Sequence, residues 1–432
     1  MAKALIVAAP HSGSGKTLVT LGLLRALRNR GIATAPFKVG PDYIDPQFHE
    51  AASGRACINL DFWAMGPDLC AGLLGQHGSD ASLAFIEGVM GLFDGPDGAE
   101  GSTADLAAAL GIPVLLVVDV AHQAQSVAAL VRGFASFRPD VAIAGLFLNR
   151  VKSDRHGELL RAALAPLGVP IVGELRQVDS LALPSRHLGL VQALENQTLE
   201  MTLESAASGV ARETNLDKLL ELARPPSNRG TNTSGMLPPL AQNMAVARDV
   251  AFAFSYPHLL DNWQRQGASL SFFSPLADEA PDPAAGAVFL PGGYPELHAG
   301  KLAGNHRFLD GLRRHGGLIY GECGGYMVLG DSLTDASGTA HRMAGLLPLE
   351  TSFKERKLHL GYRQLKPIAA APWSTPLRGH EFHYASILRE GSGERLFEAA
   401  TAAGSELPAM GLRRGKVMGS FAHVISVAPA QP

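Results

Sequence analysis

The sequence predicts an α/β protein made of two domains, and three observations carry this prediction. The chain has 432 residues, which exceeds the size at which a single hydrophobic core usually stops growing. Short apolar runs alternate with longer helical patterns in both halves, as in sheets covered by helices. Between the halves, residues 224–244 combine Pro, Gly, Ser, Thr and Asn without periodicity, which is typical of a linker. We therefore expect domains at 1–223 and 245–432.

The first domain is predicted to contain a parallel sheet. A strand at 4–8 is followed by a Gly-rich loop and by an amphipathic helix at 17–30, which ends at Gly31. Further buried strands are predicted at 33–38, 83–86, 114–118, 142–148 and 171–172. Continuous apolar strands that are separated by helices are typical of a parallel sheet covered on both faces.

The same alternation restarts after the linker. In chain order we predict strand 250–254, helix 259–266, strand 270–273, strand 287–290, helix 303–315, strand 318–320 and strand 417–421. These elements predict a second, separate α/β sheet.

Composition excludes several classes of protein. Hydrophobic residues make up 46% of the chain, charged residues 18%, and the net charge is −3. A nucleic-acid partner would require a basic face, so none is expected. The three cysteines are few and odd in number, which suits reduced thiols in a cytoplasmic protein. The N-terminal apolar run is too short for a signal peptide and no run is long enough to span a bilayer, so no membrane association is expected.

Residues 10–17, PHSGSGKT, lie between the first strand and the first helix, where a phosphate-binding loop belongs. The helix N-terminus adds a partial positive charge to backbone N–H groups that turn towards an anion. Lys16 is expected to reach the β- and γ-phosphates of ATP, and the Thr17 hydroxyl to bind Mg²⁺. The loop has Pro10 where a glycine is usual. The small residues expected to cradle the phosphates are Gly13, Ser14 and Gly15.

An Mg²⁺ ion also needs an acidic partner at a strand end. Glu87 is the candidate ligand, because Mg²⁺ prefers few carboxylates together with phosphate oxygens and water. Asp94, in the glycine-rich bend that follows, either binds metal, orients substrate or only shapes the turn. The loop KVGPDYIDP at 38–46 also follows a strand, which is where ligands bind in open α/β sheets, although on its own a rigid turn is the better explanation.

The segment GECGG at 321–325 follows an apolar strand and precedes a predicted helix. Small residues on both sides of Cys323 tolerate the sharp turn that lifts a nucleophile above a sheet. The helix N-terminus is expected to lower the pKa of the thiol and to favour the thiolate. The backbone N–H of Gly324 can form half of an oxyanion hole, and Gly292 or Gly293 in the loop LPGGYPE can form the other half.

A cysteine that hydrolyses an amide needs a histidine as proton carrier. His423 is the first candidate, because it follows the strand predicted to be last. His380 and His383, in RGHEFHY, are its competitors. Position 425 holds Ile425 rather than an acid, so we expect Cys323 and His423 to work as a dyad.

Together these motifs resemble one family, the cobyrinic and hydrogenobyrinic acid a,c-diamide synthases of corrinoid (vitamin B12) synthesis. The resemblance covers about residues 3–423, and its strings are APHSGSGKT, FKVGPDYIDPQFH, EGVMGLFDG, LNRV, PSRHLGLV, FLPGGYPELHA, GECGGYMVLG and RGHEFHY. The first half also resembles dethiobiotin synthetase, which likewise activates a carboxylate with ATP. His11 stands where cell-division ATPases of the deviant type have a lysine, which favours the synthetase branch.

The resemblance implies a P-loop domain like that of dethiobiotin synthetase, followed by a flavodoxin-like class I glutamine amidotransferase domain. It implies a ligase that uses ATP, Mg²⁺ and glutamine to amidate the a- and c-side-chain carboxylates of a hexacarboxylic corrinoid. An acyl phosphate would form on each carboxylate, and ammonia from glutamine would displace the phosphate. The residues that match the family's motifs are Asp42, Tyr43 and Ile44 for the substrate carboxylate, Glu87 and Asp94 for metal and phosphoryl transfer, Cys323 and His423 for glutamine hydrolysis, and Asn149 for adenine.

Two other interpretations stay open. The first is a ligase like cobyric acid synthase, which amidates other corrin side chains, although KVGPDYIDP favours the a,c-diamide enzymes. The second is a non-catalytic ATP switch with a relic amidotransferase domain, which the intact Lys16, Glu87 and Cys323 oppose. The sequence does not distinguish metal-free from cobalt-containing corrinoid, and it leaves open the order of amidation, an ammonia tunnel and the oligomeric state, with which a homodimer is compatible.

Overall fold

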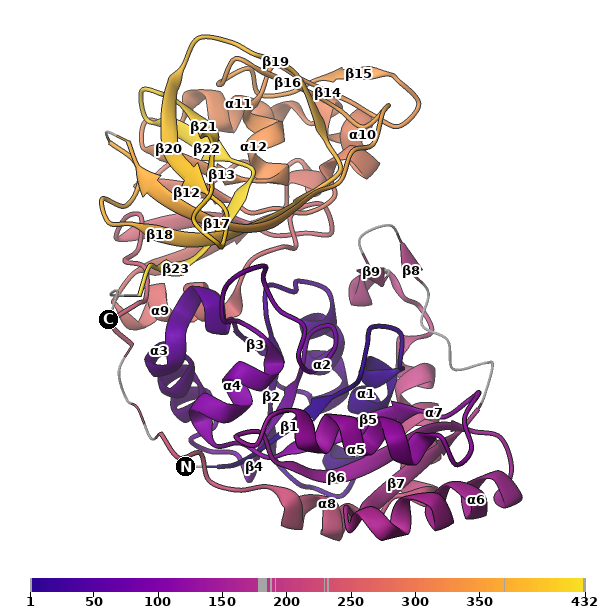
Figure 1. Ribbon diagram of the computed structural model, residues 1–432. Coiled ribbons are helices and arrows are strands. Elements are labelled where there is room, and N and C mark those ends of the chain that lie inside the picture. Colours follow the sequence, from indigo (N-terminus) through magenta and orange to yellow (C-terminus); the bar gives the residue numbers. More distant parts are fainter. Residues whose placement is uncertain are drawn as a thin grey trace. The chain divides into compact units, whose positions relative to one another are not determined.

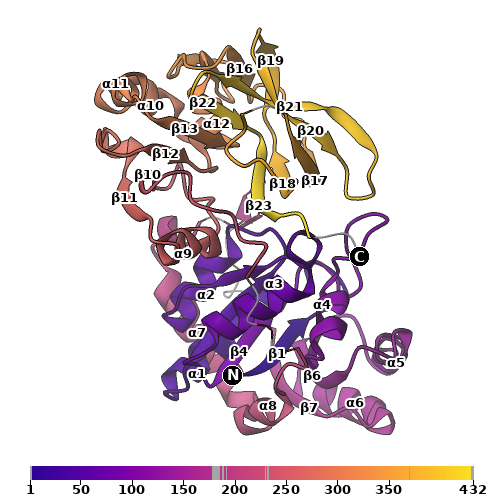
Figure 2. The same cartoon turned by 90° about the vertical axis from the view of Figure 1, so that its left-hand side faces the viewer.

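A computed structural model describes residues 2–177, 185–186, 189–190, 192–228, 230, 233–368 and 370–429. The chain divides into two compact units, Met1–Ser234 and Gly235–Pro432, which Figures 1 and 2 show from two directions. Within the described ranges, no helix combines the length and the hydropathy that crossing a bilayer requires.

Unit 1 is built on a seven-stranded sheet of order β3-β2-β4-β1-β5-β6-β7 in which every pair is parallel. Its strands are β1 (Lys3–Ala8), β2 (Thr34–Val39), β3 (Ile58–Leu60), β4 (Leu83–Glu87), β5 (Val114–Asp119), β6 (Ile143–Val151) and β7 (Ile171–Arg176). The predicted parallel sheet is confirmed, and β3 is an edge strand that the sequence analysis did not predict. Nearly every residue of β1, β2 and β4 is buried, as continuous apolar strands require.

Helices cover this sheet (Figure 1). They are α1 (Lys16–Asn29), α2 (Asp45–Ser53), α3 (Phe62–His77), α4 (Thr103–Leu110), α5 (Val127–Phe137), α6 (Asp154–Leu164), α7 (Leu199–Glu213) and α8 (Leu216–Leu222). Helix α1 packs against α2 and α7, α3 against α4, and α5 against α6. Shorter elements are the 3₁₀ helices at Ala165–Leu167 and Ala193–Glu195 and the antiparallel pair β8 (Ser185–Arg186) and β9 (Gly189–Leu190).

Unit 2 contains a ten-stranded mixed sheet of order β11-β10-β12-β13-β22-β21-β20-β17-β18-β23. Its first five strands are parallel, and their order along the chain corresponds to 2-1-3-4-5, the flavodoxin-like arrangement. These strands are β10 (Asn243–Ala247), β11 (Ser269–Phe273), β12 (Ala287–Leu290), β13 (Leu318–Glu322) and β22 (Val417–Ser420). The helices beside them are α9 (Pro257–Arg265), α10 (Ala299–Gly304), α11 (His306–Arg314) and α12 (Gly324–Leu329), with 3₁₀ turns at Pro275–Ala277 and Pro295–His298.

The other five strands of this sheet pair antiparallel. They are β17 (His359–Pro367), β18 (Leu377–His383), β20 (Glu394–Ala400), β21 (Glu406–Arg414) and β23 (Ala422–Val427). Only Phe421 separates β22 from β23 in the sequence, yet four strands lie between them in the sheet order. A separate small sheet of order β15-β14-β16-β19 contains β14 (Ser332–Thr334), β15 (Ala340–Arg342), β16 (Leu349–Ser352) and β19 (Ser386–Glu390).

Three sequence predictions for unit 2 are wrong in detail. Residues 250–252 form a turn in which Oδ1 of Asp249 accepts a hydrogen bond from the Ala251 N–H, and Phe254 makes an isolated bridge to Gly292. The strand of this region is instead β10 at Asn243–Ala247. The helix predicted at 303–315 is broken at Asn305, which ends α10 and precedes α11. The strand predicted at 417–421 ends at Ser420, and His423 lies inside the further strand β23.

The expected linker at 224–244 takes part in both units at its ends. The Arg224 carbonyl accepts a hydrogen bond from the Ala4 N–H in unit 1 at 2.8 Å. Leu237 is buried in unit 2, where its carbonyl accepts a hydrogen bond from Asn262 at 2.8 Å. The two units divide between Ser234 and Gly235.

Candidate active sites

The phosphate loop of unit 1 has the local geometry that anion binding requires. It joins β1 to α1, and Gly13 and Gly15 have φ of 82° and 80°, a left-handed conformation that costs glycine little. A Cβ at Gly15 would lie 2.1 Å from Nδ2 of Asn149, so no other residue fits there. The same Asn149 Nδ2, at the end of β6, donates to the Ser14 carbonyl at 2.8 Å. Asn149 therefore holds the loop in place, and its contact with adenine stays a prediction.

Lys16 extends from the start of α1 towards the loop that follows β4. Its Nζ donates to the Met90 carbonyl at 3.3 Å, and Met90 has the strained φ of 46°. Burial, together with the charge of Lys38, lowers the pKa of Lys16. An ammonium group that is poorly solvated in this way is well suited to pair with phosphate oxygens.

A cluster of charged side chains lies beside Lys16. Nζ of Lys38, on β2, is 2.6 Å from Asp45 Oδ2, 2.9 Å from Glu87 Oε1 and 3.7 Å from Asp42 Oδ2. Oγ1 of Thr17 is 2.8 Å from Glu87 Oε1 and 3.4 Å from Asp45 Oδ2. Burial opposes the charge on Lys38, but Asp45 and Glu87 outweigh it and raise the pKa of the amine well above its usual value.

Glu87 is fully buried at the end of β4, and both its oxygens have partners. Its Oε2 lies 2.6 Å from Nε2 of His49, whose Nδ1 lies 3.4 Å from Sγ of Cys57. Although burial opposes ionisation, Lys38 and His49 hold the pKa of Glu87 well below its usual range. The carboxylate is therefore ionised and held from both sides.

The donor set of this cluster fits Mg²⁺, which binds hard oxygen ligands and retains water and phosphate oxygens. A hydroxyl and three carboxylates converge, and the Lys38 ammonium compensates their charge. Sequence reasoning named Thr17 and Glu87 but missed Lys38, Asp45 and His49. All three are in the string KVGPDYIDPQFH, and the available signal was that polar side chains gather at the end of β2 and on α2.

The other predicted residues of unit 1 have different surroundings. Oδ1 of Asp42 accepts hydrogen bonds from the backbone N–H groups of Ile44 and Asp45, so this residue shapes the loop, and burial and Asp45 raise its pKa to about 6. Tyr43 and Ile44 are buried in the same loop. Asp94 is exposed, and its Oδ2 accepts from the Gly91 N–H at 3.0 Å, which is the turn-shaping role considered above.

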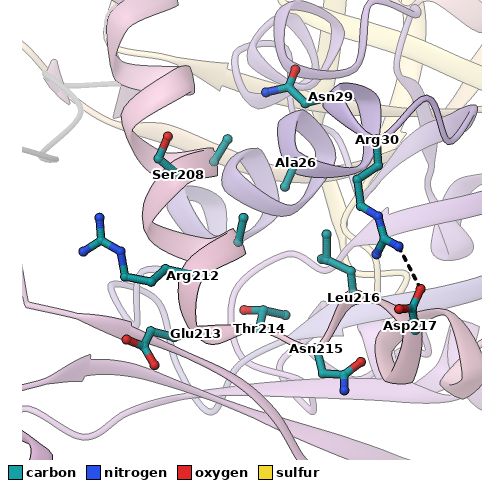
Figure 3. A pocket seen from close by; sticks show the side chains of 12 residues that line it. Ala26, Asn29, Arg30, Ser208, Arg212, Glu213, Thr214, Asn215, Leu216 and Asp217 are labelled. Atoms are coloured by element: carbon teal, nitrogen blue, oxygen red, sulfur yellow. Dashed lines mark hydrogen bonds and ion pairs between the residues drawn. The ribbon is translucent and has the colours of Figure 1, made fainter.

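Unit 1 contains a cavity of about 780 Å³, whose lining side chains Figure 3 shows from close by. Its lining comes from the C-terminal ends of α1 and α7 and the start of α8, and the Arg30–Asp217 ion pair of 3.0 Å crosses it. The phosphate loop is at the other end of α1, about 20 Å away for a 14-residue helix. None of the predicted site residues lines this cavity.

Cys323 occupies a strained elbow in unit 2. It lies between β13 and α12 with φ 47° and ψ −105°, a conformation that non-glycine residues rarely adopt. Its N–H donates to the Ser420 carbonyl at 2.8 Å, which ties the elbow to the end of β22. The strain is located at the predicted nucleophile, where such outliers tend to occur.

The predicted glycines and His423 meet at this elbow. A Cβ at Gly292 would lie 2.3 Å from Cε1 of His423 and 3.2 Å from Cβ of Cys323. A Cβ at Gly324 would lie 3.0 Å from the Gly293 nitrogen. The structure therefore brings together all five residues that sequence reasoning assigned to glutamine hydrolysis.

His423 reaches the elbow from β23, and an acid that the sequence analysis missed lies beside it. Oε2 of Glu322 is 3.9 Å from Nδ1 of His423, and its Oε1 accepts the Val424 N–H at 3.0 Å. Burial raises the pKa of Glu322 to about 8. Glu322 directly precedes Cys323 on β13, whereas the sequence analysis looked for an acid two residues after His423. Its position next to Cys323 was the signal that the sequence offered for this acid.

The protonation states differ from the predicted thiolate. Burial, together with the charge of Glu296, raises the pKa of the Cys323 thiol, and the Gly324 N–H opposes this rise only in part. Burial, together with His380 and His383, lowers the pKa of His423 to about 3. The N–H groups at the start of α12 do not outweigh the burial of the thiol. These shifts favour a neutral thiol and a neutral imidazole over an ion pair.

RGHEFHY forms most of β18, beside β23. His380 is directly opposite His423 in the ladder, and the Phe382 carbonyl is 4.0 Å from Sγ of Cys323. The sequence analysis treated His380 and His383 as competitors for the role of base, and both turn out to be buried near the elbow. The geometry at Gly292 places His423 against the nucleophile.

Comparison with known proteins finds a family match for each unit. Residues 5–191 match the family described as the CobQ/CobB/MinD/ParA nucleotide binding domain, and residues 243–430 match the CobB/CobQ-like glutamine amidotransferase domain. A protein of Brucella anthropi named hydrogenobyrinate a,c-diamide synthase is 56% identical over 428 residues, 98% of each chain. Proteins of the same name from a Sinorhizobium species and from Mesorhizobium japonicum are 54% and 48% identical, over 99% of this chain and 99% and 100% of theirs.

These matches confirm the predicted fold class, a P-loop domain followed by a glutamine amidotransferase domain. These relatives are more than half identical to the chain, and each match covers nearly all of this chain and nearly all of the relative. The chain belongs to the hydrogenobyrinate a,c-diamide synthase family.

Proposed function

We propose that this chain uses ATP and glutamine to amidate the a- and c-acetate carboxylates of hydrogenobyrinic acid, in cobalamin biosynthesis. The observation that carries the proposal is the presence, in one chain, of an acid-lined phosphate loop and of a Cys323–His423 elbow lined with glycine. Relatives that carry the name of this reaction match over 98–99% of the chain. This support favours the a,c-diamide reaction over a reaction like that of cobyric acid synthase.

Unit 1 activates the carboxylate. Lys16 and the loop N–H groups bind the phosphates of ATP, and Thr17 and Glu87 would hold Mg²⁺, which would neutralise phosphate charge. The γ-phosphoryl group passes to a substrate carboxylate oxygen, giving an acyl phosphate and ADP. Lys38 compensates the charge of Glu87 and Asp45, so these carboxylates stay ionised although they are buried.

Unit 2 releases ammonia from glutamine. Because both groups are neutral, His423 acts as a general base: it takes the thiol proton while Sγ of Cys323 attacks the amide carbon. The N–H groups of Gly293 and Gly324 are the donors we assign to the oxyanion. His423 then returns the proton to the leaving nitrogen, and water hydrolyses the thioester to glutamate. Ammonia displaces phosphate from the acyl phosphate, which completes the amide.

We also propose a cytoplasmic location. Cys57, Cys70 and Cys323 are all free and buried thiols, which suits a reducing compartment.

The test is a product analysis with two substrates. Purified protein is incubated with ATP, Mg²⁺ and glutamine, and with either metal-free or cobalt-containing hexacarboxylic corrinoid. We expect the metal-free compound to gain two amides, each seen as replacement of OH by NH₂ in the product mass. More than two amides, or none with either corrinoid while glutamate is released, would contradict the proposed reaction.

A further inference from the structure

Three side chains with metal-binding groups gather on one face of the β17–β18 ladder, outside the dyad. His359 is directly opposite His383 in the ladder, and Glu381 is opposite Gly361, two residues further along each strand. Because side chains alternate between the two faces of a strand, His359, Glu381 and His383 all point to the same face. One ligand atom from each of His359, Glu381 and His383 lies within 4.8 Å of the other two. The mechanism proposed above uses none of the three.

The geometry within this cluster is already close to that of a metal site. Nε2 of His383 lies 2.8 Å from Oε1 of Glu381. The rings of His359 and His383 are parallel within 9°, with centroids 4.7 Å apart. Donors around a tetrahedral zinc ion are about 3.3 Å apart, given bonds of about 2.0–2.1 Å, and the three ligand atoms here lie within 4.8 Å of one another.

Burial and neighbouring groups prepare the ligands. His383 and Glu381 are buried, and His359 is half-buried, which leaves an entry path from solvent. The Arg363 guanidinium binds Oε2 of Glu381 at 2.7 Å, so the carboxylate is oriented with Oε1 towards His383. Such outer contacts orient the ligating carboxylates of metal sites.

The chemistry of the three donors also suits a metal. Two imidazoles and one carboxylate are the protein ligands of many zinc sites that keep a fourth position open for water.

We propose that His359, Glu381 and His383 form a binding site for a divalent transition metal ion of the zinc class. Nitrogen ligands favour zinc and its neighbours over Mg²⁺, so this site is distinct from the magnesium cluster of unit 1. A bound ion would pin β17 to β18. It would thereby fix the strand whose Phe382 carbonyl is 4.0 Å from the nucleophilic sulfur.

The test uses full-length protein without a histidine tag and Co²⁺ as a spectroscopic probe for zinc. We expect one equivalent of Co²⁺ to give visible absorption bands of a four- or five-coordinate nitrogen and oxygen site. His359→Ala should weaken binding by about 100-fold or more, since it removes a ligand. This ligand is half-exposed, so its loss should leave the fold intact. The matched control is His306→Ala, an exposed histidine of α11 in the same unit, which should bind as the wild type does.

Two further measurements make the outcome decisive. Zn²⁺ should raise the unfolding temperature of the wild type and of His306→Ala, but not that of His359→Ala. Cys323→Ser should bind Co²⁺ as the wild type does. The proposal is overturned if Co²⁺ gives no such bands, or if the bands survive in His359→Ala. It is equally overturned if a sulfur-to-cobalt charge-transfer band appears and is lost in Cys323→Ser, because the ion would then occupy the nucleophile.

Discussion

The packing of Gly292 against the catalytic pair gives a direct test of the glutaminase site. A Cβ added at this position would lie 2.3 Å from Cε1 of His423 and 3.2 Å from Cβ of Cys323. Carbon atoms in contact are normally about 3.5–4.0 Å apart, so Gly292→Ala must push the imidazole away by more than about 1 Å. Cys323 is held by its elbow and by the Ser420 carbonyl, so the ring has to move instead.

A displacement of this size has a predictable cost. Misplacing a reacting group by about 1 Å lowers a rate by about 10²-fold, and loss of a general base lowers it by about 10²–10⁴-fold. We therefore expect Gly292→Ala to lose at least about 10²-fold in glutamine hydrolysis. Amidation with ammonium chloride in place of glutamine should stay near the wild-type rate, because the carboxylate is activated in unit 1.

The assay measures glutamate release and corrinoid amidation separately. Gly304→Ala is the matched control, since a Cβ there meets no atom within 4 Å and the residue is in the same unit. If Gly292→Ala folds normally and hydrolyses glutamine at the wild-type rate, His423 does not lie against the nucleophile as described. If both nitrogen sources fail in the folded variant, the division of labour between the units is wrong.

Four further changes test the remaining assignments. Cys323→Ser should abolish glutamine-dependent amidation and keep the ammonia-dependent rate. Loss of both rates in a folded variant would contradict the assignment of Cys323 to glutamine hydrolysis alone. Lys16→Ala should remove amidation with either nitrogen source, because phosphoryl charge is no longer stabilised; near-normal synthesis from ammonia would refute this role. His423→Ala should lower glutamate release by about 10²–10⁴-fold while ammonia still supports amidation, which separate kinetic assays decide. The free energy of unfolding should fall between about pH 6.5 and 4, by up to about 1.4 kcal/mol per imidazole per pH unit. His258, His380 and His423 have pKa values lowered to about 4, 3 and 3, so over this range these imidazoles bind protons mainly in the unfolded chain. Asp42 and Glu322, with pKa values raised to about 6 and 8, oppose this trend as two groups against three, and urea unfolding at pH 7.0 and 5.5 shows the sign.

The sequence was sufficient to predict those parts of the candidate sites that are built from one short, continuous segment. The strand, loop and helix around Gly15 and Lys16 follow from adjacent residues, because a phosphate loop is built from one continuous segment. The elbow at Cys323 is local in the same way. Both could be predicted, and so could the parallel sheet of unit 1.

The parts that the sequence analysis missed depend on contacts between distant segments. Lys38, His49 and Glu87 meet only because β2 and β4 are neighbours in the sheet and α2 starts above them. The thiol pKa depends on the burial of the elbow, and a helix-dipole argument from local sequence gave the wrong direction. Strand β10 was missed because its short apolar run directly follows residues of linker composition.

The edge strand β23 has a consequence for how this sheet can meet another chain. Strand β23 is last in the sheet order and pairs with β18. Three of its backbone groups are used by other segments of unit 2: the Val424 N–H donates to Oε1 of Glu322, the Ile425 carbonyl lies 3.1 Å from Nε2 of His258, and the Val427 N–H donates to the Gly235 carbonyl. Backbone groups that are already paired are not free to bind a strand of another chain. The strand that carries His423 is therefore a less open edge than its place in the sheet order suggests.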